Sequence, residues 1–254
     1  MSTKMTKREL QSPDKFTTTT ASWLDWATKH PRETTIAGVV VAALLVAVGL
    51  IASGGPSTDP KAGAALSAAL ELVDRKVEKP GAAAAEDEKK EPTFASEQEK
   101  QEAIVKAMQA VRDEHRGTSS ALTATLAQAD AFLALGKSDE AIARYEEYLS
   151  AAPKSGSLRF LAHEGKAAAL QAKGDVDGAI AALEAMAAEL PGYKDRAQLG
   201  KGRIHEAKGE WEKAREAYQS VKTDFPDGAS NRAATERLSQ LDLRHPAEAP
   251  ADAK

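Results

Sequence analysis

The five histidines are the first residues to test for chemistry, because histidine is the commonest general base and a frequent metal ligand. They stand singly along the chain at His30, His115, His163, His205 and His245. None has a second histidine or a carboxylate at metal-ligand spacing, and no HExxH occurs. We therefore interpret His163 and His205, which fall inside expected helices, as packing or surface residues.

Other reactive groups are equally isolated. The chain has no cysteine, which excludes disulfides, zinc–thiolate sites and thiol nucleophiles. It has no GxSxG, GxxxxGK[ST] or GxGxxG, and "GKGR" at Gly200–Arg203 fits a close contact between helices. Because catalysis needs converging groups, we expect no enzyme, no cofactor and no metal. A buried polar cluster would be the feature that favours an enzyme instead.

The charge and composition of the chain limit the classes of partner that it could bind and indicate its fold class. The 34 basic and 38 acidic residues give a net charge of -4, so no strong basic field exists to hold nucleic acid. Aromatic residues make up only 5% of the chain, and alanine is abundant. This composition is typical of a helix-rich protein with small residues at its packing contacts.

Three similar stretches recur: "GKSDEAIARYEEYLSAAP", "GDVDGAIAALEAMAAELP" and "GEWEKAREAYQSVKTDFP". They begin at Gly136, Gly174 and Gly209, so the period is 38 and then 35 residues, the surplus falling in the "KSGS" loop. Glycine accepts the left-handed conformation that ends a helix, so each glycine is expected to end a first helix. Ser138 and Asp175 can then cap the second helix.

The second helix of each copy carries one apolar stripe. An alanine stands five residues after the glycine, and larger apolar residues follow at helical offsets. In copy order, the stripe comprises Ala141, Tyr145, Tyr148 and Ala152; Ala179, Leu183, Met186 and Leu190; and Ala214, Tyr218, Val221 and Phe225. A proline ends each stripe.

The first helices repeat as well. Seven residues before each glycine stands a small residue, which lets the paired helix approach closely: Ala129, Ala167 and Gly202. This pattern resembles the tetratricopeptide repeat, a helix–turn–helix unit of about 34 residues. The resemblance implies an all-α tetratricopeptide-repeat α-solenoid over 118–245, with 230–243 as a capping helix. The large residue usual early in the first helix is missing, replaced by Thr125, His163 and Gln198.

Residues 34–54 predict one transmembrane helix ahead of the repeats. The segment holds no charged residue, and about 20 residues suffice to cross the hydrocarbon core. A buried soluble helix and a cleaved signal peptide are the alternatives, but no polar face breaks the run and the lead-in is long. The residues before it are richer in lysine and arginine than those after it, so the N-terminus is expected in the cytoplasm.

The tail 1–33 carries a second membrane feature. Apolar positions within "FTTTTASWLDWATKHP" share one helix face, and Trp23 and Trp26 would lie at headgroup level. A tail without regular structure is the alternative interpretation. Beyond the membrane segment, 55–117 is expected to form a degenerate helical pair, with helices over 59–80 and 96–117.

Two further segments have an amino-acid composition typical of disordered chain. A charged Ala/Glu/Lys linker, 81–92, separates the two helices of the degenerate pair. The tail 246–254 is also expected to be disordered. The sequence leaves open whether the helix over 59–80 packs on the repeats or stands apart as a stalk.

The whole arrangement resembles the YfgM family. The similarity lies in three segments: "FTTTTASWLDWATKHPRETTIAGVVVAALL", which leads into the expected transmembrane helix, the helix that follows it, and "LAQADAFLALGKSDEAIARYEEYL" in the first repeat. The resemblance implies a single-pass bacterial inner-membrane protein with a periplasmic domain. It also implies a scaffold ancillary to the SecYEG translocon, working with a PpiD-like periplasmic chaperone. A structural adaptor of another envelope complex, for secretion, motility or the cell wall, is the alternative.

The first helices are expected to line a concave protein-binding groove. The set is mixed, with leucines near its start and charges near its end, which suits an extended peptide or another protein. It does not reproduce the Lys/Asn set that clamps heat-shock chaperone termini. Some members could instead pack on the neighbouring first helix. The expected groove residues are Leu126, Asp130, Leu133, Leu161, Glu164, Gln171, Arg196, Leu199, Arg203 and Glu206.

Overall fold

The computed structural model describes residues 59–77 and 93–246, and its regular structure there is helical. Within these ranges the one β-type contact is an isolated bridge between Val77 and Phe94. The predictions for 1–33 with Trp23 and Trp26, for 34–54, for 81–92 and for the last eight residues lie outside the described residues. Of the helices described, none combines the length and apolarity needed to span a bilayer.

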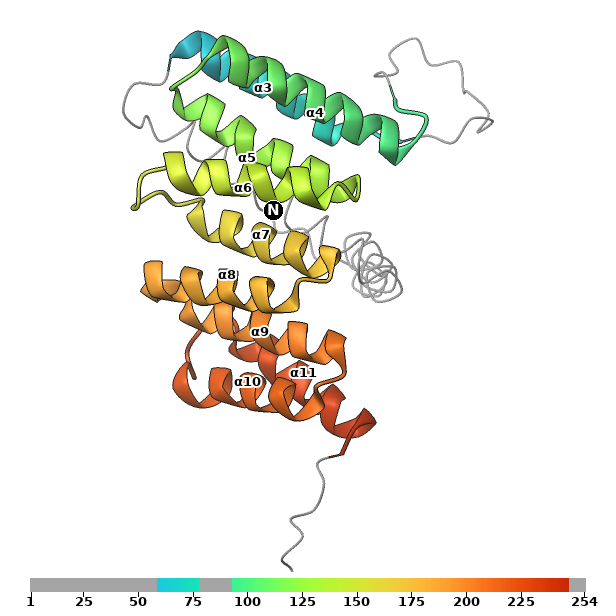
Figure 1. Ribbon diagram of the computed structural model, residues 1–254, viewed down its shortest axis with the longest axis vertical. Coiled ribbons are helices and arrows are strands. Elements are labelled where there is room, and N and C mark those ends of the chain that lie inside the picture. The colour runs from blue at the N-terminus through green and yellow to red at the C-terminus, as the bar shows by residue number, and fades with distance from the viewer. Residues whose placement is uncertain (1–58, 78–92, 247–254) are drawn as a thin grey trace, which may run out of the picture. The chain divides into compact units, whose positions relative to one another are not determined.

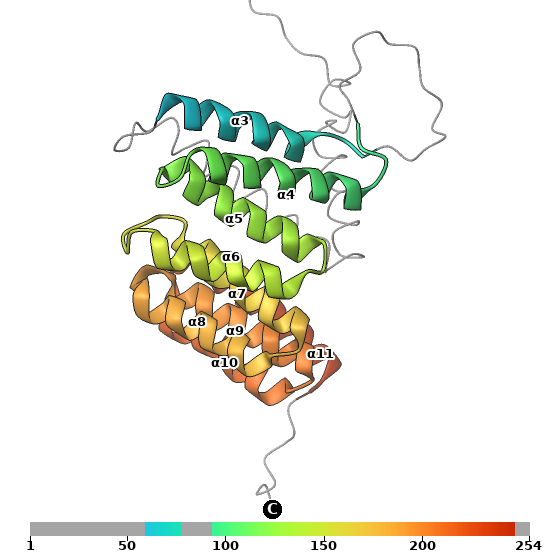
Figure 2. The same cartoon turned by 45° about the horizontal axis from the view of Figure 1, so that its top comes forward.

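The helices form consecutive pairs, each packed on the next in chain order (Figures 1 and 2). Three of these pairs are the predicted repeats. The helices are α3 (Pro60–Asp74), α4 (Glu97–Glu114), α5 (Ser119–Ala134), α6 (Ser138–Ala151), α7 (Arg159–Lys173), α8 (Val176–Glu189), α9 (Lys194–Lys208), α10 (Trp211–Asp224) and α11 (Asn231–Arg244), with a 3-10 turn η1 (Pro191–Tyr193) before α9. The predicted all-α repeat fold is confirmed.

The repeated glycines end the first helices as predicted. Gly136, Gly174 and Gly209 have φ of 72°, 90° and 77°, the left-handed region that a side chain would strain. Asp175 caps α8, since its carboxylate accepts the Gly178 N–H at 2.9 Å. The predicted Ser138 cap is wrong: Ser138 is the first residue of α6, the cap position is Lys137, and no side chain closes it.

The repeated apolar stripe forms the core of the stack. The alanines Ala141, Ala179 and Ala214 are fully buried, and so are Tyr145 and Tyr218. The small residues of the first helices meet these rings. A Cβ on Gly165 would collide with the Tyr145 ring, and one on Gly202 with the Tyr218 ring. Each tyrosine ring therefore occupies the space that a missing side chain leaves. Gly202 is one of the predicted small residues and meets the helix paired with its own, whereas Gly165 was not predicted and meets the preceding repeat.

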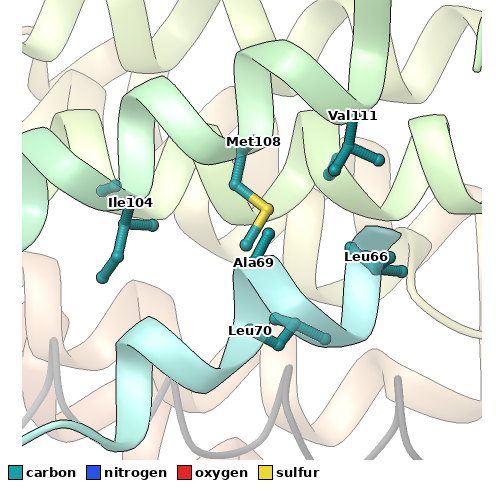
Figure 3. Packing of buried hydrophobic residues seen from close by; sticks show 8 residues of the cluster. Leu66, Ala69, Leu70, Ile104, Met108 and Val111 are labelled. Atoms are coloured by element: carbon teal, nitrogen blue, oxygen red, sulfur yellow. The ribbon is translucent and has the colours of Figure 1, made fainter. Parts of the chain in front are cut away.

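The helix that follows residue 59 packs on the stack. Leu66, Ala69 and Leu70 of α3 lie against Ile104 and Met108 of α4 in one buried cluster (Figure 3). The same cluster reaches α5, so α3 and α4 cover the first repeat as a degenerate pair. The helix is shorter than predicted and ends at Asp74, not at residue 80.

The last helix covers the other end of the described stack. Leu238 and Leu241 of α11 pack with Tyr218 and Val221 of α10 and with Leu199 of α9. Its remaining positions are mostly polar and exposed. A solenoid needs such a polar outer face on its terminal element, so α11 fits the predicted capping role.

Candidate protein-binding face

The first helices lie side by side, because α3 contacts α5, α5 contacts α7, α7 contacts α9 and α9 contacts α11. We call the surface formed by the accessible residues of α5, α7 and α9, together with Tyr193 of η1 and Arg237 of α11, the first-helix face. This surface is where sequence analysis places the groove. The second helices α6, α8 and α10 alternate with them along the chain.

Four of the ten predicted groove residues are buried, so their predicted exposure is wrong. Leu126, Leu161 and Leu199 are 2%, 1% and 5% exposed. Asp130 is 6% exposed and accepts the hydroxyl proton of Tyr145 at 2.5 Å. Each first helix has neighbours on both sides, so positions that face away from its own partner become covered by the next helix.

The other six predicted residues remain accessible. Leu133, Glu164, Gln171 and Glu206 are half-buried, and Arg196 and Arg203 are exposed. Their part in binding stays a prediction. Five of the six come from α7 and α9, so the accessible part of the predicted set is concentrated on two adjacent helices.

Arg196 joins α9 to α7. Its Nε donates to the Glu164 carboxylate, and this hydrogen bond is the main cause that raises the pKa of Arg196. Its guanidinium carbon lies 5.1 Å from the centre of the Phe160 ring, within the range of a cation–π contact. Phe160 stacks in turn on Tyr193, with ring centres 4.5 Å apart.

Glu206 joins α9 to its neighbours on the other side. Its carboxylate accepts the Tyr218 hydroxyl proton at 2.6 Å. The same carboxylate forms an ion pair with Arg237 of α11, with Nη1 at 3.5 Å from Oε1. Burial and then the Glu206 hydrogen bond raise the pKa of Tyr218, so its hydroxyl stays protonated and donates.

Arg203 stands between these two ion pairs without one of its own. It is exposed, and among the residues that the structure describes no carboxylate lies within ion-pair distance of it. Desolvation by the surrounding protein lowers the pKa of Arg203, and repulsion from Arg237 and Arg196 adds to this effect. The guanidinium thus combines access to solvent with crowded, partly cationic surroundings.

A buried polar cluster, which sequence analysis did not anticipate, ties the first repeat to the second. Arg159 is 1% exposed and donates from Nη1 to the carbonyl oxygens of Leu149 and Ala152, at 2.7 and 2.9 Å. Its other donors bind the Glu189 carboxylate and hold the pKa of Glu189 down at about 2. His163 adds a contact to Glu189 at 3.4 Å, and burial lowers the pKa of His163.

This cluster is structural. The backbone and Glu189 contacts of Arg159 fasten the end of α6 to the end of α8 beside the "KSGS" loop, where the longer period arises. Where the structure describes the chain, every buried side-chain polar atom has a partner, and no group of His, Asp and Glu is arranged to hold a metal ion.

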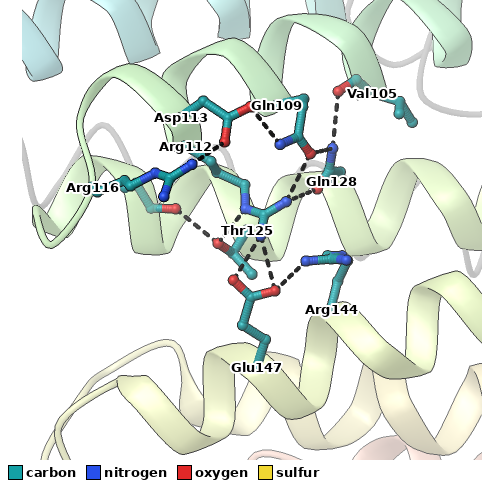
Figure 4. A network of polar contacts seen from close by, with 10 residues as sticks. Val105, Gln109, Arg112, Asp113, Arg116, Thr125, Gln128, Arg144 and Glu147 are labelled. Carbon is teal, nitrogen blue, oxygen red and sulfur yellow. Dashed lines mark hydrogen bonds and ion pairs between the residues drawn. The ribbon is translucent and has the colours of Figure 1, made fainter.

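A second polar network fixes α4, α5 and α6 to one another (Figure 4). Arg112 donates to Thr125 at 2.9 Å and to both oxygens of Glu147 at 2.6 and 2.9 Å. Gln128 joins the network and donates to the Val105 carbonyl oxygen at 3.1 Å. Thr125, where the repeat resemblance implies a large residue, therefore serves as a hydrogen-bonding position.

A shallow hollow lies between α8, α9 and α10, away from the first-helix face residues named above. Its volume is about 320 Å³, with an apolar floor that includes Leu183, Ala187 and Phe225. Glu184, Lys201 and Asp224 lie at its rim, and Lys201 and Glu184 form an ion pair at 2.9 Å. Lys194 lines the hollow as well, and of these four charged residues only Lys201 and Glu184 form an ion pair within the described part of the chain.

Three residues of the first-helix face were missed: Phe160, Tyr193 and Arg237. Phe160 could have been found, because it stands four residues before Glu164 and so shares its helix face. Tyr193 lies in the turn before α9, and Arg237 lies on the capping helix. Neither position carries a repeat signal, so their place on this face depends on how the helices pack.

Among solved structures, one similar chain is the MamA RS-1 ArsTM double mutant, with 20% identity, a TM-score of 0.43, and coverage of 57% of this chain and 75% of that one. Another holds nearly identical TPR-like repeats of a protein described as a kinesin light chain of Podospora anserina, with 15% identity, a TM-score of 0.48, and coverage of 87% and 96%. At these values neither structure identifies a partner.

Among curated proteins, none matches this sequence. A family profile described as "Tetratricopeptide repeat-like domain" matches residues 33–242, which is most of the chain. Repeats of this kind generally mediate protein–protein interaction, because stacked helix pairs present an extended surface. The repeat pattern, the paired helices and this match together show that the chain belongs to the tetratricopeptide repeat-like domain family.

Proposed function

We propose that this protein is a membrane-anchored scaffold for protein–protein interaction in the bacterial envelope. The observation that carries the proposal is the first-helix face, where accessible Arg196, Arg203 and Phe160 lie on a rigid helical stack. Arginine and aromatic side chains are enriched among the residues that dominate binding energy at protein interfaces. In its described part, the stack holds no group of His, Asp and Glu arranged to bind a metal ion.

The anchor in this proposal is the uncharged segment 34–54. Its length suits one membrane crossing, and the basic residues before it favour a cytoplasmic N-terminus and a periplasmic repeat domain. The family match begins at residue 33, so the segment belongs to the region that this chain shares with its family. Protease added to spheroplasts should digest the repeat domain, whereas an intact domain would contradict periplasmic exposure.

The partner in this proposal is the SecYEG translocon together with a PpiD-like periplasmic chaperone. The resemblance of the chain to the YfgM family supports this assignment. A membrane anchor would hold the repeats close to the translocon exit, so weak contacts with a chaperone or an emerging chain would suffice.

The test is in-cell crosslinking. A photoreactive amino acid at Arg203, on the first-helix face, is compared with one at Arg232, an exposed residue also on the stack. Arg232 and Arg237 are five residues apart on α11, so their side chains point about 140° apart and Arg232 faces away from Glu206. Mass spectrometry should find translocon or chaperone peptides crosslinked at Arg203 and far fewer at Arg232. Crosslinks to a secretion, motility or cell-wall complex would instead support the adaptor alternative.

A further inference from the structure

We propose that the first-helix face selects partner segments by an acidic side chain that binds Arg203. The inference rests on the proposed function, since it names the chemistry of the segment that the scaffold would hold. The surface concerned is the Arg203 patch, which we define as Phe160, Arg196, Arg203 and Arg237. It spans α7, α9 and α11, three helices that contact one another in order.

The patch has more guanidinium groups than there are carboxylates beside it. Three guanidinium groups, on Arg196, Arg203 and Arg237, lie near two carboxylates, on Glu164 and Glu206. Glu164 already binds Arg196, and Glu206 already accepts from Tyr218 while it pairs with Arg237. Arg203 is left with all its donors available to a ligand, as far as the described residues go.

A carboxylate is the group that best completes this arrangement. A guanidinium presents its N–H donors in a planar fork that can bind both oxygens of a carboxylate. The surrounding protein partly desolvates Arg203, and Arg237 and Arg196 repel its charge, while Glu164 attracts it without forming an ion pair with it. An incoming carboxylate would relieve that repulsion, and partial desolvation strengthens a charge-assisted hydrogen bond.

The spacing of the patch fits an extended segment. Arg196 and Arg203 are two helical turns apart, about 10 Å along α9. An extended chain advances about 3.3 Å per residue, so a carboxylate on Arg203 places the residue three positions away near Arg196. The half-buried Phe160 ring contacts the Arg196 guanidinium and the Tyr193 ring, so only its remaining exposed edge offers that residue an apolar contact.

The occupant is therefore an internal stretch of another protein with Asp or Glu three residues from an apolar side chain. A lipid surface or a nucleic acid would need a cluster of basic residues. Here two of the three guanidinium groups are already paired, and the chain carries a net charge of -4. One unpaired guanidinium selects one carboxylate.

The test uses the full chain in mild detergent and a probe peptide whose N-terminus carries an uncharged fluorescent dye through an amide bond and whose C-terminus is amidated. The probe is dye-Ser-Leu-Ser-Ser-Glu-Ser-Ser-Leu-Ser-amide, and its matched control replaces the single glutamate with glutamine. A third peptide carries glutamine and a free C-terminal carboxylate. Fluorescence anisotropy at low salt measures Kd for wild type, Arg203→Gln, Arg203→Lys and the control variant Arg232→Gln.

We expect Arg203→Gln to weaken binding of the glutamate peptide about ten-fold, the size of one lost charge-assisted hydrogen bond. The Kd of Arg203→Lys for the glutamate peptide should lie between those of wild type and Arg203→Gln. The Kd of Arg232→Gln should match that of wild type. The wild-type protein should bind the glutamine peptide as weakly as Arg203→Gln binds the glutamate peptide. Circular dichroism confirms that each variant keeps its helices.

Three outcomes would overturn the inference: equal binding of the glutamate and glutamine peptides, equal losses in Arg203→Gln and Arg232→Gln, or preference for the free C-terminal carboxylate. Absence of binding to all three peptides would overturn it as well. None of these results bears on the proposed scaffold itself, which is tested separately by crosslinking from Arg203 and by protease digestion of spheroplasts.

Discussion

Tyr145 in the first repeat and Tyr218 in the third stand nine residues after their glycines, and both are fully buried. Their hydroxyl groups are satisfied in different ways. Tyr145 donates to Asp130, a carboxyl group with 6% exposure, whereas Tyr218 donates to the half-buried Glu206, which also pairs with Arg237. The second repeat has no hydroxyl group to satisfy, because Leu183 stands at this position.

This difference shows that the packing of the tyrosine ring and the hydrogen bond of its hydroxyl group are separate requirements. Both rings pack against a glycine of a first helix, but Tyr145 meets Gly165 of the next repeat, whereas Tyr218 meets Gly202 of its own repeat. The acid comes from a different position each time, six residues before the glycine in the first repeat and three before it in the third. Only the acid of the third repeat reaches the first-helix face, where its second oxygen is available to Arg237.

Removal of either ring should have the largest effect. Tyr145→Ala and Tyr218→Ala should each lower the free energy of unfolding by about 3–5 kcal/mol, since each leaves a cavity in the core. Urea unfolding of the full chain, followed by circular dichroism, measures the change. Leu243→Ala, at a position that is 84% exposed, serves as control and should stay close to wild type. A small loss for only one tyrosine would break the equivalence of the two repeats.

The pH dependence of stability should come next. Burial raises the pKa of Asp130 from 3.8 to about 7, so the folded state binds a proton more tightly than the unfolded state. This contribution to stability is fully present below about pH 4 and is lost as pH rises to about 7, with an upper bound of about 4 kcal/mol. Urea unfolding at several pH values should show the loss in wild type and not in Asp130→Asn. Identical profiles for the two proteins would refute the assignment.

Removal of the hydroxyl alone should distinguish the repeats. Tyr145→Phe leaves the buried Asp130 without its donor and should cost about 1–3 kcal/mol at pH 8, while Tyr218→Phe should cost less than about 1 kcal/mol because Glu206 keeps Arg237. The gap should narrow at pH 5, where Asp130 is protonated in the folded state. Thermal unfolding of both variants at the two pH values measures it, and equal losses at pH 8 would contradict the comparison.

Helix capping extends the comparison to the second repeat, with the smallest effect. Asp175→Ala should cost about 1 kcal/mol, because its carboxylate accepts the Gly178 N–H. Ser138→Ala, at the first residue of α6 in the first repeat, should change stability by less than about 0.5 kcal/mol, since its side chain closes no cap. A larger effect at Ser138 than at Asp175 would reverse the assignment of the two caps.

Periodicity predicted the features that belong to single helices. The stripe residues Ala141, Tyr145, Leu183 and Tyr218 are buried because a 3.6-residue repeat fixes which side of a helix is apolar. The glycines that end the first helices followed from the need for a left-handed residue. These signals depend only on residues close together in the sequence, so each copy of the repeat adds support to the structure predicted for the others.

Contacts between helices were harder to predict. The sequence could not indicate that Leu161 and Leu199 become covered, since that depends on how the next first helix packs against them. The Arg159 cluster joins residues 30 positions apart, a separation that no helical period connects. On the candidate face, Arg203 was predicted, but its lack of an ion pair depends on how Glu164 and Glu206 are shared among three arginines.

The packing of α3 limits how far the repeats could stand from a membrane. If the proposed anchor ends at residue 54, four residues separate it from Asp59, and an extended chain of that length reaches less than about 20 Å. Because α3 is fixed in the stack by Leu66 and Leu70, it cannot lengthen that connection as a free arm would. The repeat stack would thus be attached to the membrane through a short connection at its α3 end.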